Sequence, residues 1–181
     1  DMLAEEVPKP NAEEATKAPS SVSDALKTKS PGERMFADVE NSNWVTLGDA
    51  SAPVIYAFVD PQCPHCHEFI QEVKENYVDK GLVQIRLIPV GFFDGSLPQA
   101  AFVLAAPDGV DRFLRQMNGE KDALPVKSDM STQAVQKNMA LMQAWKFNVT
   151  PLITYRSLAG EVKIIRGKPK DLNALIADLP G

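Results

Sequence analysis

The stretch that most constrains the fold runs from Val54 to His67. An apolar run there is followed by a short turn and then by Cys63-Pro64-His65-Cys66. The run is typical of a buried strand, and the residues after the turn have the spacing of a helix. These are the only two cysteines of the chain. A Cys-x-x-Cys pair at such a strand-to-helix junction predicts a redox-active dithiol.

The helical spacing predicts a different position for each cysteine. Cys66 falls in one apolar stripe with Ile70, Val73 and Tyr77, so it should face the sheet and be buried. Cys63 lies one turn earlier, at or next to the N-cap, and should be the exposed sulfur. Residues three apart on a helix are close enough to form a disulfide without backbone movement.

The start of the helix favours a thiolate on Cys63. Unpaired backbone N–H groups and the helix dipole stabilise a negative sulfur there, the dipole by about 0.3–1 kcal/mol. His65 can add a hydrogen bond or positive charge, and such sites have pKa values of roughly 3.5–7.5. Pro64 suits the first helical turn because it has no N–H group to leave unpaired.

The motif allows three other interpretations. A structural disulfide would close a very small loop and constrain the unfolded chain little. Cys63-Pro64-His65-Cys66-His67 also matches the c-type haem attachment motif, with His67 as axial ligand. A zinc or copper site would use both cysteines with His65 and His67, but one thiol pair is an incomplete structural site. The strand-to-helix context favours the dithiol, with no metal and no cofactor.

The chain is long enough for one sizeable domain, with 181 residues of which 44% are apolar. We expect a disordered leader or tether over residues 1–29, a linker helix over 30–42 and a catalytic domain over 43–181. An oligomerising helix using Val22 and Leu26 is the alternative for the leader. The start at Asp1 indicates a processed or shortened chain, and no signal peptide is recognised.

The rest of the domain alternates strands and helices. Strands are expected at 43–47, 54–59 and 82–90, and a hairpin turns at 157–160 between strands 152–155 and 162–165. Helices are expected over 97–117, 132–146 and 171–179. Phe92 and Phe93 could form an exposed substrate patch, and core positions are the preferred interpretation. The pattern predicts an α/β fold: a mixed central sheet flanked by helices, with a helical insertion at about 97–147.

The sequence from Trp44 onward resembles thioredoxin-fold periplasmic disulfide oxidoreductases of the Dsb family, especially the DsbG and DsbC catalytic domains. The similarity lies in residues 58–66, in residues 83–86 with Val90-Gly91, and in residues 148–151. It implies that Thr150-Pro151 is a cis peptide bond facing the dithiol. Thr150, Pro151 and Pro64 would then contact an extended substrate segment.

The resemblance implies a protein-disulfide reductase or isomerase of the periplasm, with cysteine-containing proteins as substrates. A DsbD-like membrane reductase would keep it reduced. A DsbA-like oxidase served by a DsbB-like partner is the alternative, because Pro64-His65 is the dipeptide of the DsbA oxidases. Ala57 stands where DsbA has a buried acid, so Asp60 becomes a candidate for proton transfer to Cys66. The N-terminal dimerisation domain of the isomerases is not recognised.

Nothing in the composition indicates nucleic-acid binding, since the net charge is −5. No apolar run approaches the roughly 20 residues that a membrane-spanning helix needs. Having both cysteines within the motif fits an oxidising compartment, where a spare thiol would be a liability.

Overall fold

The computed structural model describes residues 29–181, and the leader predicted over residues 1–29 lies outside this range except for Lys29. Of the described residues, 29–41 belong to one unit and 42–181 to a second. The first contains helix α4, Pro31–Glu40. Ser30 caps it, because its Oγ accepts a hydrogen bond from the Glu33 N–H, and Pro31 occupies the first turn.

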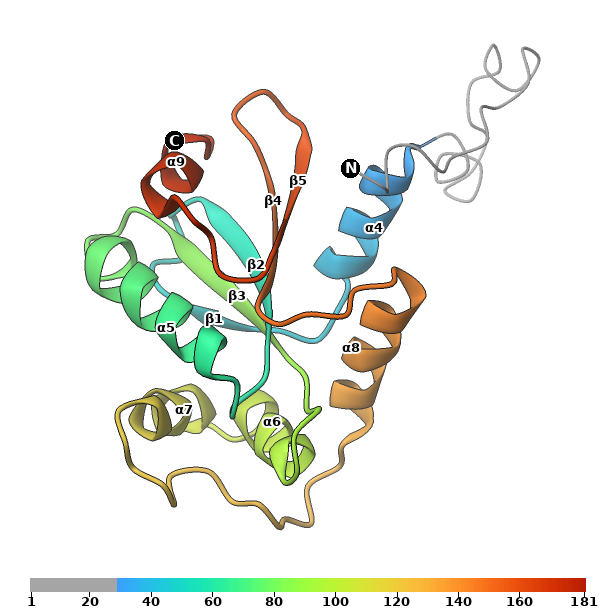
Figure 1. Cartoon of the computed structure of the whole chain (residues 1–181), viewed down its shortest axis with the longest axis vertical. Helices are drawn as coiled ribbons and strands as arrows, with labels where there is room; N and C mark the ends of the chain where they lie inside the picture. Colours follow the sequence, from blue (N-terminus) through green and yellow to red (C-terminus); the bar gives the residue numbers. More distant parts are fainter. Residues whose placement is uncertain (1–28) are drawn as a thin grey trace, which may run out of the picture. The chain divides into compact units, whose positions relative to one another are not determined.

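The second unit is built on a five-stranded mixed sheet (Figure 1). Its strand order is β1-β3-β2-β4-β5, and β2 pairs with β3 in parallel while the other neighbours are antiparallel. The central strand β2 consists of β-branched, aromatic and other apolar residues and is almost completely buried. The strands are β1 (Val45–Leu47), β2 (Val54–Val59), β3 (Gln84–Pro89), β4 (Leu152–Arg156) and β5 (Val162–Arg166).

Helix α5 (Pro64–Val73) connects β2 to β3 and continues as a π-helical turn, η1 (Lys74–Val78). Its buried residues are Cys66, Phe69, Ile70 and Val73, as the apolar stripe predicted, and Tyr77 is partly buried against the same core. The C-terminal helix α9 (Leu172–Ala177) lies on the same side of the sheet as α5 (Figure 1). These helices and the sheet enclose one hydrophobic core.

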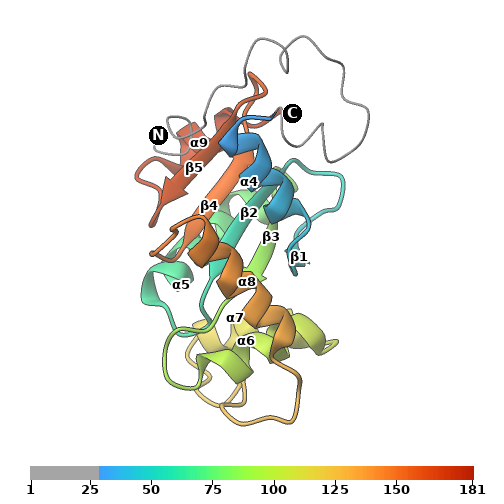
Figure 2. The same ribbon diagram turned by 90° about the vertical axis from the view of Figure 1, so that its right-hand side faces the viewer.

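The helical insertion contains three helices, α6 (Ser96–Ala105), α7 (Gly109–Met117) and α8 (Gln133–Ala144). In both ribbon views α6 and α7 lie together at one end of the sheet, and Figure 1 shows α8 on the opposite face from α5 (Figures 1 and 2). The uninterrupted helix expected over 97–117 is wrong. Pro107 lacks an N–H group and holds the preceding Ala106 extended, at φ −77 and ψ 143, so the helix breaks there.

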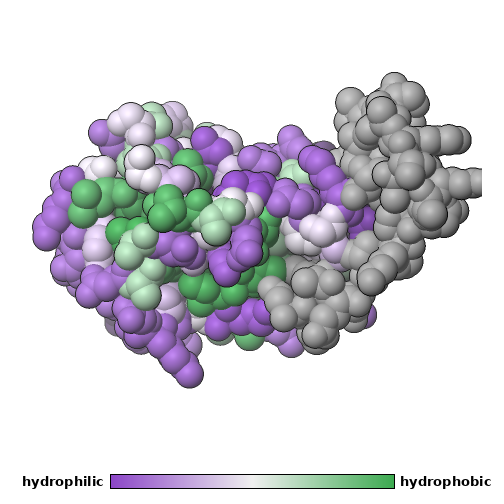
Figure 3. Space-filling model, turned by 90° about the horizontal axis from the view of Figure 1, so that it is seen from above, coloured by the Kyte–Doolittle hydropathy of each residue, from purple (hydrophilic) through white to green (hydrophobic). Residues whose placement is uncertain are grey.

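The hairpin of β4 and β5 turns at residues 157–160, as predicted, with Gly160 at a positive φ of 83. Seen from the end that carries this turn, green hydrophobic surface lies between purple hydrophilic residues (Figure 3). In the described part of the chain, no helix is long and apolar enough to cross a membrane.

Candidate functional site

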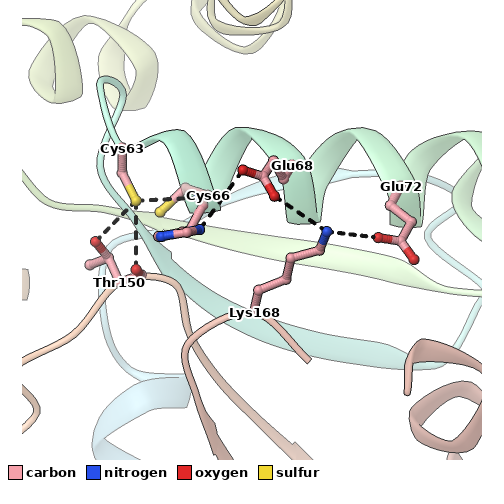
Figure 4. A network of polar contacts seen from close by, with 7 residues as sticks. Cys63, Cys66, Glu68, Glu72, Thr150 and Lys168 are labelled. Atoms are coloured by element: carbon pink, nitrogen blue, oxygen red, sulfur yellow. Dashed lines mark hydrogen bonds and ion pairs between the residues drawn. The ribbon is translucent and has the colours of Figure 1, made fainter. Parts of the chain in front are cut away.

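Cys63 is the N-cap of α5, so its sulfur lies over the open first turn of the helix. The Sγ accepts a hydrogen bond from the Cys66 N–H at 3.2 Å. Thr150 adds two contacts: its hydroxyl donates to the Cys63 Sγ at 3.4 Å, and its carbonyl lies 3.6 Å from the same sulfur. Figure 4 shows Cys66 and Thr150 next to this sulfur. The predicted N-cap position is therefore confirmed.

The expectation that Cys63 is the exposed sulfur is wrong. Cys63 is only 4% exposed and Cys66 is fully buried, and both are free thiols. The reason is tertiary, because Thr150, which lies 87 positions further along the chain, packs against the Cys63 sulfur. A disulfide partner therefore meets only a small exposed part of Cys63.

The two thiols differ in acidity. The pKa of Cys63 is lowered from 9.0 to about 6, first by a hydrogen bond with the Cys66 side chain and then by the Thr150 hydroxyl and the Cys66 N–H. Burial and the negative charge of Asp60 oppose this change. The pKa of Cys66 is raised, above all by burial and next by its hydrogen bond to Cys63. One sulfur is thus prepared as a thiolate while its neighbour keeps its proton.

Pro64 and His65 lie on the surface beside the dithiol. The His65 side chain is 71% exposed, and its Nδ1 lies 3.8 Å from a carboxylate oxygen of Glu68. Glu68 and Glu72 also pair with Lys168, at 3.4 and 3.3 Å, as Figure 4 shows. In the described structure the hydrogen bonds that lower the Cys63 pKa come from Cys66 and Thr150, so the effect of His65 on this pKa stays a prediction.

The Thr150–Pro151 peptide bond is cis, as the resemblance implied. It immediately precedes β4, which pairs with β2, and this pairing carries Thr150 to the start of α5. The contact between Thr150 and the Cys63 sulfur was not predicted from the sequence. The resemblance placed Thr150 opposite the dithiol with its backbone toward a substrate, but it gave no role to the hydroxyl group that donates to the sulfur.

His67, the axial ligand of the haem alternative, is engaged within the protein. Its Nε2 lies 2.6 Å from the Pro61 carbonyl, which can only accept, so this nitrogen donates. Its ring also meets Phe113 of α7 edge-on, with centroids 6.1 Å apart. Among residues 29–181, no three His, Cys, Asp or Glu side chains are grouped to hold a metal ion.

Asp60 follows β2 directly and is fully buried. Its carboxylate oxygens contact the turn before Cys63 and the loop after β3, rather than the Cys66 side chain. Ala57, six residues before Cys63, is buried within β2 and supplies no acid. The suggested proton transfer between Asp60 and Cys66 stays a hypothesis.

A groove of about 650 Å³ begins at Thr150. Phe92 and Phe93 belong to its wall and are 57% and 49% exposed, so the preferred interpretation of both as core residues is wrong. No lining residue carries a charge: they are Phe92, Phe93, Gln136, Met139, Ala140, Met142, Gln143, Phe147, Asn148, Val149 and Thr150. The groove was missed because the loop after β3, helix α8 and the cis-proline segment meet only in the folded chain.

A chain of glutamines joins the helical insertion to the turn before Cys63, and sequence reasoning missed it as well. Gln62 donates to the Gln99 side-chain carbonyl at 3.0 Å, and Gln99 donates to Gln116 at 3.2 Å. Gln116 in turn donates to the Pro61 carbonyl at 3.0 Å. Gln99 is only 3% exposed, and a buried amide within an apolar helix was the available signal.

Comparisons with known proteins agree with this geometry. The family description "Thioredoxin" matches residues 40–119. The "Thiol:disulfide interchange protein DsbG" of Escherichia coli is 35% identical over 155 residues, which cover 81% of this chain and 62% of the relative. The protein of the same name from Pseudomonas aeruginosa is 32% identical over 142 residues, covering 75% and 55%. The chain therefore spans less than two thirds of the length of these relatives.

A solved structure shows the same fold. The disulfide interchange protein from Neisseria gonorrhoeae superposes with a TM-score of 0.59 at 19% identity, over 75% of this chain and 94% of that one. At 19% identity the superposition shows the fold alone. The family relationship rests on the two sequence relatives. The chain belongs to the Dsb family of thioredoxin-fold proteins.

Proposed function

We propose that the protein is a periplasmic thiol:disulfide oxidoreductase that exchanges disulfides with cysteines of other proteins. The observation that carries this proposal is the unequal thiol pair. Cys63 has a pKa of about 6, while the pKa of Cys66, one helical turn away, is raised. An entry thiolate next to a protonated second thiol is the arrangement that disulfide exchange requires.

In the reducing direction, the Cys63 thiolate attacks one sulfur of a substrate disulfide. A mixed disulfide forms, and the other substrate sulfur leaves as a thiolate. Cys66 then loses its proton and attacks the Cys63 Sγ, which forms the Cys63–Cys66 disulfide and releases the second substrate thiolate. Two electrons have passed to the substrate. The same steps in reverse oxidise a substrate dithiol.

The neighbouring residues have supporting roles in this proposal. His65 adds positive charge near the thiolate when it is protonated, and its exposed position beside Pro64 would let both touch a bound substrate. The Thr150 hydroxyl stabilises the thiolate. The backbone of Thr150 and the cis bond to Pro151 would offer hydrogen-bonding groups to an extended substrate segment.

The groove beside Thr150 suggests which substrates fit. A substrate joined to Cys63 by a mixed disulfide would lie next to Phe92, Phe93 and Val149. Apolar residues beside the substrate cysteine would then be buried in the groove. Amide side chains such as Gln136, Gln143 and Asn148 could pair with the substrate backbone. Proteins with exposed apolar segments, as in unfolded chains, are therefore favoured over small thiols.

Trapping tests the proposal and the groove together. Cys66→Ala should accumulate a mixed disulfide on Cys63 with a cysteine peptide carrying phenylalanine neighbours. Adding Phe92→Ser and Phe93→Ser should slow this trapping but leave the reaction with glutathione disulfide unchanged. Leu82→Ser and Leu158→Ser are matched controls, because both leucines are exposed elsewhere, at 49% and 67%. If Cys66→Ala traps neither reagent, Cys63 is not the entry sulfur.

We infer that electrons flow toward the substrate, as a DsbG- or DsbC-like reductase or isomerase would pass them, with a DsbD-like membrane reductase as partner. The two sequence relatives carry the name DsbG, which supports a DsbG-like assignment. A DsbA-like oxidase with a DsbB-like partner is the alternative, and the low Cys63 pKa favours it because thiolate stabilisation makes the disulfide more oxidising.

Acid quenching of source cells, followed by alkylation with a heavy thiol reagent, distinguishes the two directions. Most of the protein should take up the label if it is kept reduced for repair or isomerisation. Protein that is labelled only after chemical reduction would identify an oxidase. Cysteines that stay unlabelled even then would indicate thioether-linked haem.

A further inference from the structure

Asp60 is a buried acid that the proposed exchange steps do not use. Its side chain is 0% exposed, and its carboxylate accepts three hydrogen bonds. Oδ1 accepts from the Gln62 N–H at 3.0 Å and from the Ser96 hydroxyl at 2.6 Å, and Oδ2 accepts from the Phe92 N–H at 2.6 Å. All three partners donate, which matches an ionised carboxylate. Across residues 29–181, no Lys, Arg or His forms an ion pair with it.

On one side, Asp60 shapes the turn that carries the nucleophile. Its Oδ1 and its backbone carbonyl receive the N–H groups of Gln62 and Cys63, the second at 3.1 Å. These two hydrogen bonds close the turn between the end of β2 and the N-cap of α5. The position of the Cys63 sulfur therefore depends on Asp60.

On the other side, Asp60 holds the loop between β3 and α6. Phe92 begins the exposed part of that loop and lines the groove, while Ser96 starts α6 and is fully buried. The loop has little room to shift, because a Cβ on Gly91 would lie 2.5 Å from backbone atoms of Leu97. One carboxylate thus connects the groove wall to the turn of the dithiol.

Hydrogen bonding does not remove the charge of this carboxylate. A negative group close to a thiol disfavours the thiolate, and low surrounding dielectric strengthens the effect. Cys66 and Asp60 are the titratable groups among the main causes that shift the pKa of Cys63. The charge of Asp60 raises this pKa, whereas the hydrogen bonds lower it by more.

We propose that Asp60 is a positioning residue that connects the groove wall to the Cys63 turn and, through its fixed negative charge, keeps the dithiol less oxidising than its other contacts would make it. The inference rests on the proposed disulfide exchange. It concerns how strongly Cys63 is activated rather than whether Cys63 reacts.

Asp60→Asn removes the charge and keeps the size of the side chain, while its amide nitrogen replaces one of the two accepting oxygens. The Cys63 pKa should fall by about half a unit, which is about a threefold change in the ionisation constant. The equilibrium with glutathione should shift by a similar factor toward the reduced protein. Asp94→Asn is the matched control, because it removes an exposed charge from the same loop and should leave both values unchanged. An unchanged Cys63 pKa in folded Asp60→Asn would overturn the proposal.

Ser96→Ala gives an independent test that does not depend on Asp60→Asn being folded. It removes one of the three hydrogen bonds that partly neutralise the carboxylate charge. The charge should then act more strongly on Cys63, so the Cys63 pKa should rise. A fall or no change would mean that the charge of Asp60 does not act on Cys63, and would refute the proposal. These measurements need only the pure protein. If the parent fails to exchange with glutathione, the proposed function is wrong; if it exchanges normally and the variants match it, only this inference is wrong.

Discussion

Thr150→Val removes the hydroxyl that donates to the Cys63 sulfur and keeps the branched shape of the side chain. A hydrogen bond to a charged group contributes about 1.5–3 kcal/mol. The lower end applies here, because the O···S distance is 3.4 Å and the Cys66 N–H also donates to the thiolate. About 1.4 kcal/mol corresponds to one pKa unit. The Cys63 pKa should therefore rise from about 6 to roughly 7.

The thiolate fraction is measured by ultraviolet absorbance and by the rate of alkylation as a function of pH. At pH 6 about half of Cys63 should be ionised in the parent and about a tenth in Thr150→Val. The couple should become more reducing by about 30 mV. Thr154→Val is the control, because this buried hydroxyl donates to the Lys163 carbonyl instead, so only stability should fall. Equal pKa values in Thr150→Val and the parent would refute the role of the hydroxyl.

Two further predictions concern charge at the site. His65→Leu should raise the Cys63 pKa and make the couple more reducing, by about 30 mV per pKa unit; an unchanged pKa would leave the Cys66 and Thr150 contacts as the whole cause. The free energy of unfolding of the reduced protein should rise between pH 6 and pH 9, because Cys63 releases its proton at lower pH when folded than when unfolded. This gain in unfolding free energy is at most about 4 kcal/mol and should be lost as the pH falls through 6. Denaturant titrations at several pH values measure it, and it should be absent in Cys63→Ser.

Local patterns were sufficient for much of the fold. The central strand, the helix after it and the terminal hairpin were predicted because each is encoded in a few consecutive residues. The break between α6 and α7 had a local signal too, since Pro107 cannot continue a helix, yet the apolar spacing on both sides outweighed it. The position of Thr150 near the dithiol came from the family resemblance.

The properties that sequence reasoning missed depend on distant contacts. Cys63 is buried because Thr150 covers it, and Phe92 is held at the surface by a hydrogen bond from its N–H to Asp60, 32 positions away. Neither contact has a periodic signature along the chain. A buried acid or amide such as Asp60 or Gln99 can be noticed in a sequence, but its partners become known only when the sheet and the insertion are assembled.

The distance along the chain between Cys63 and Thr150 has a consequence for how the protein is made. Strand β2 and helix α5 are synthesised well before residue 150, and until β4 pairs with β2 the Cys63 sulfur lacks the threonine hydroxyl. In an incomplete chain a smaller fraction of Cys63 should therefore be ionised than in the finished protein. The full thiolate fraction is reached only when the last strands of the sheet have formed, so an immature chain is less prone to react with the wrong partner at neutral pH.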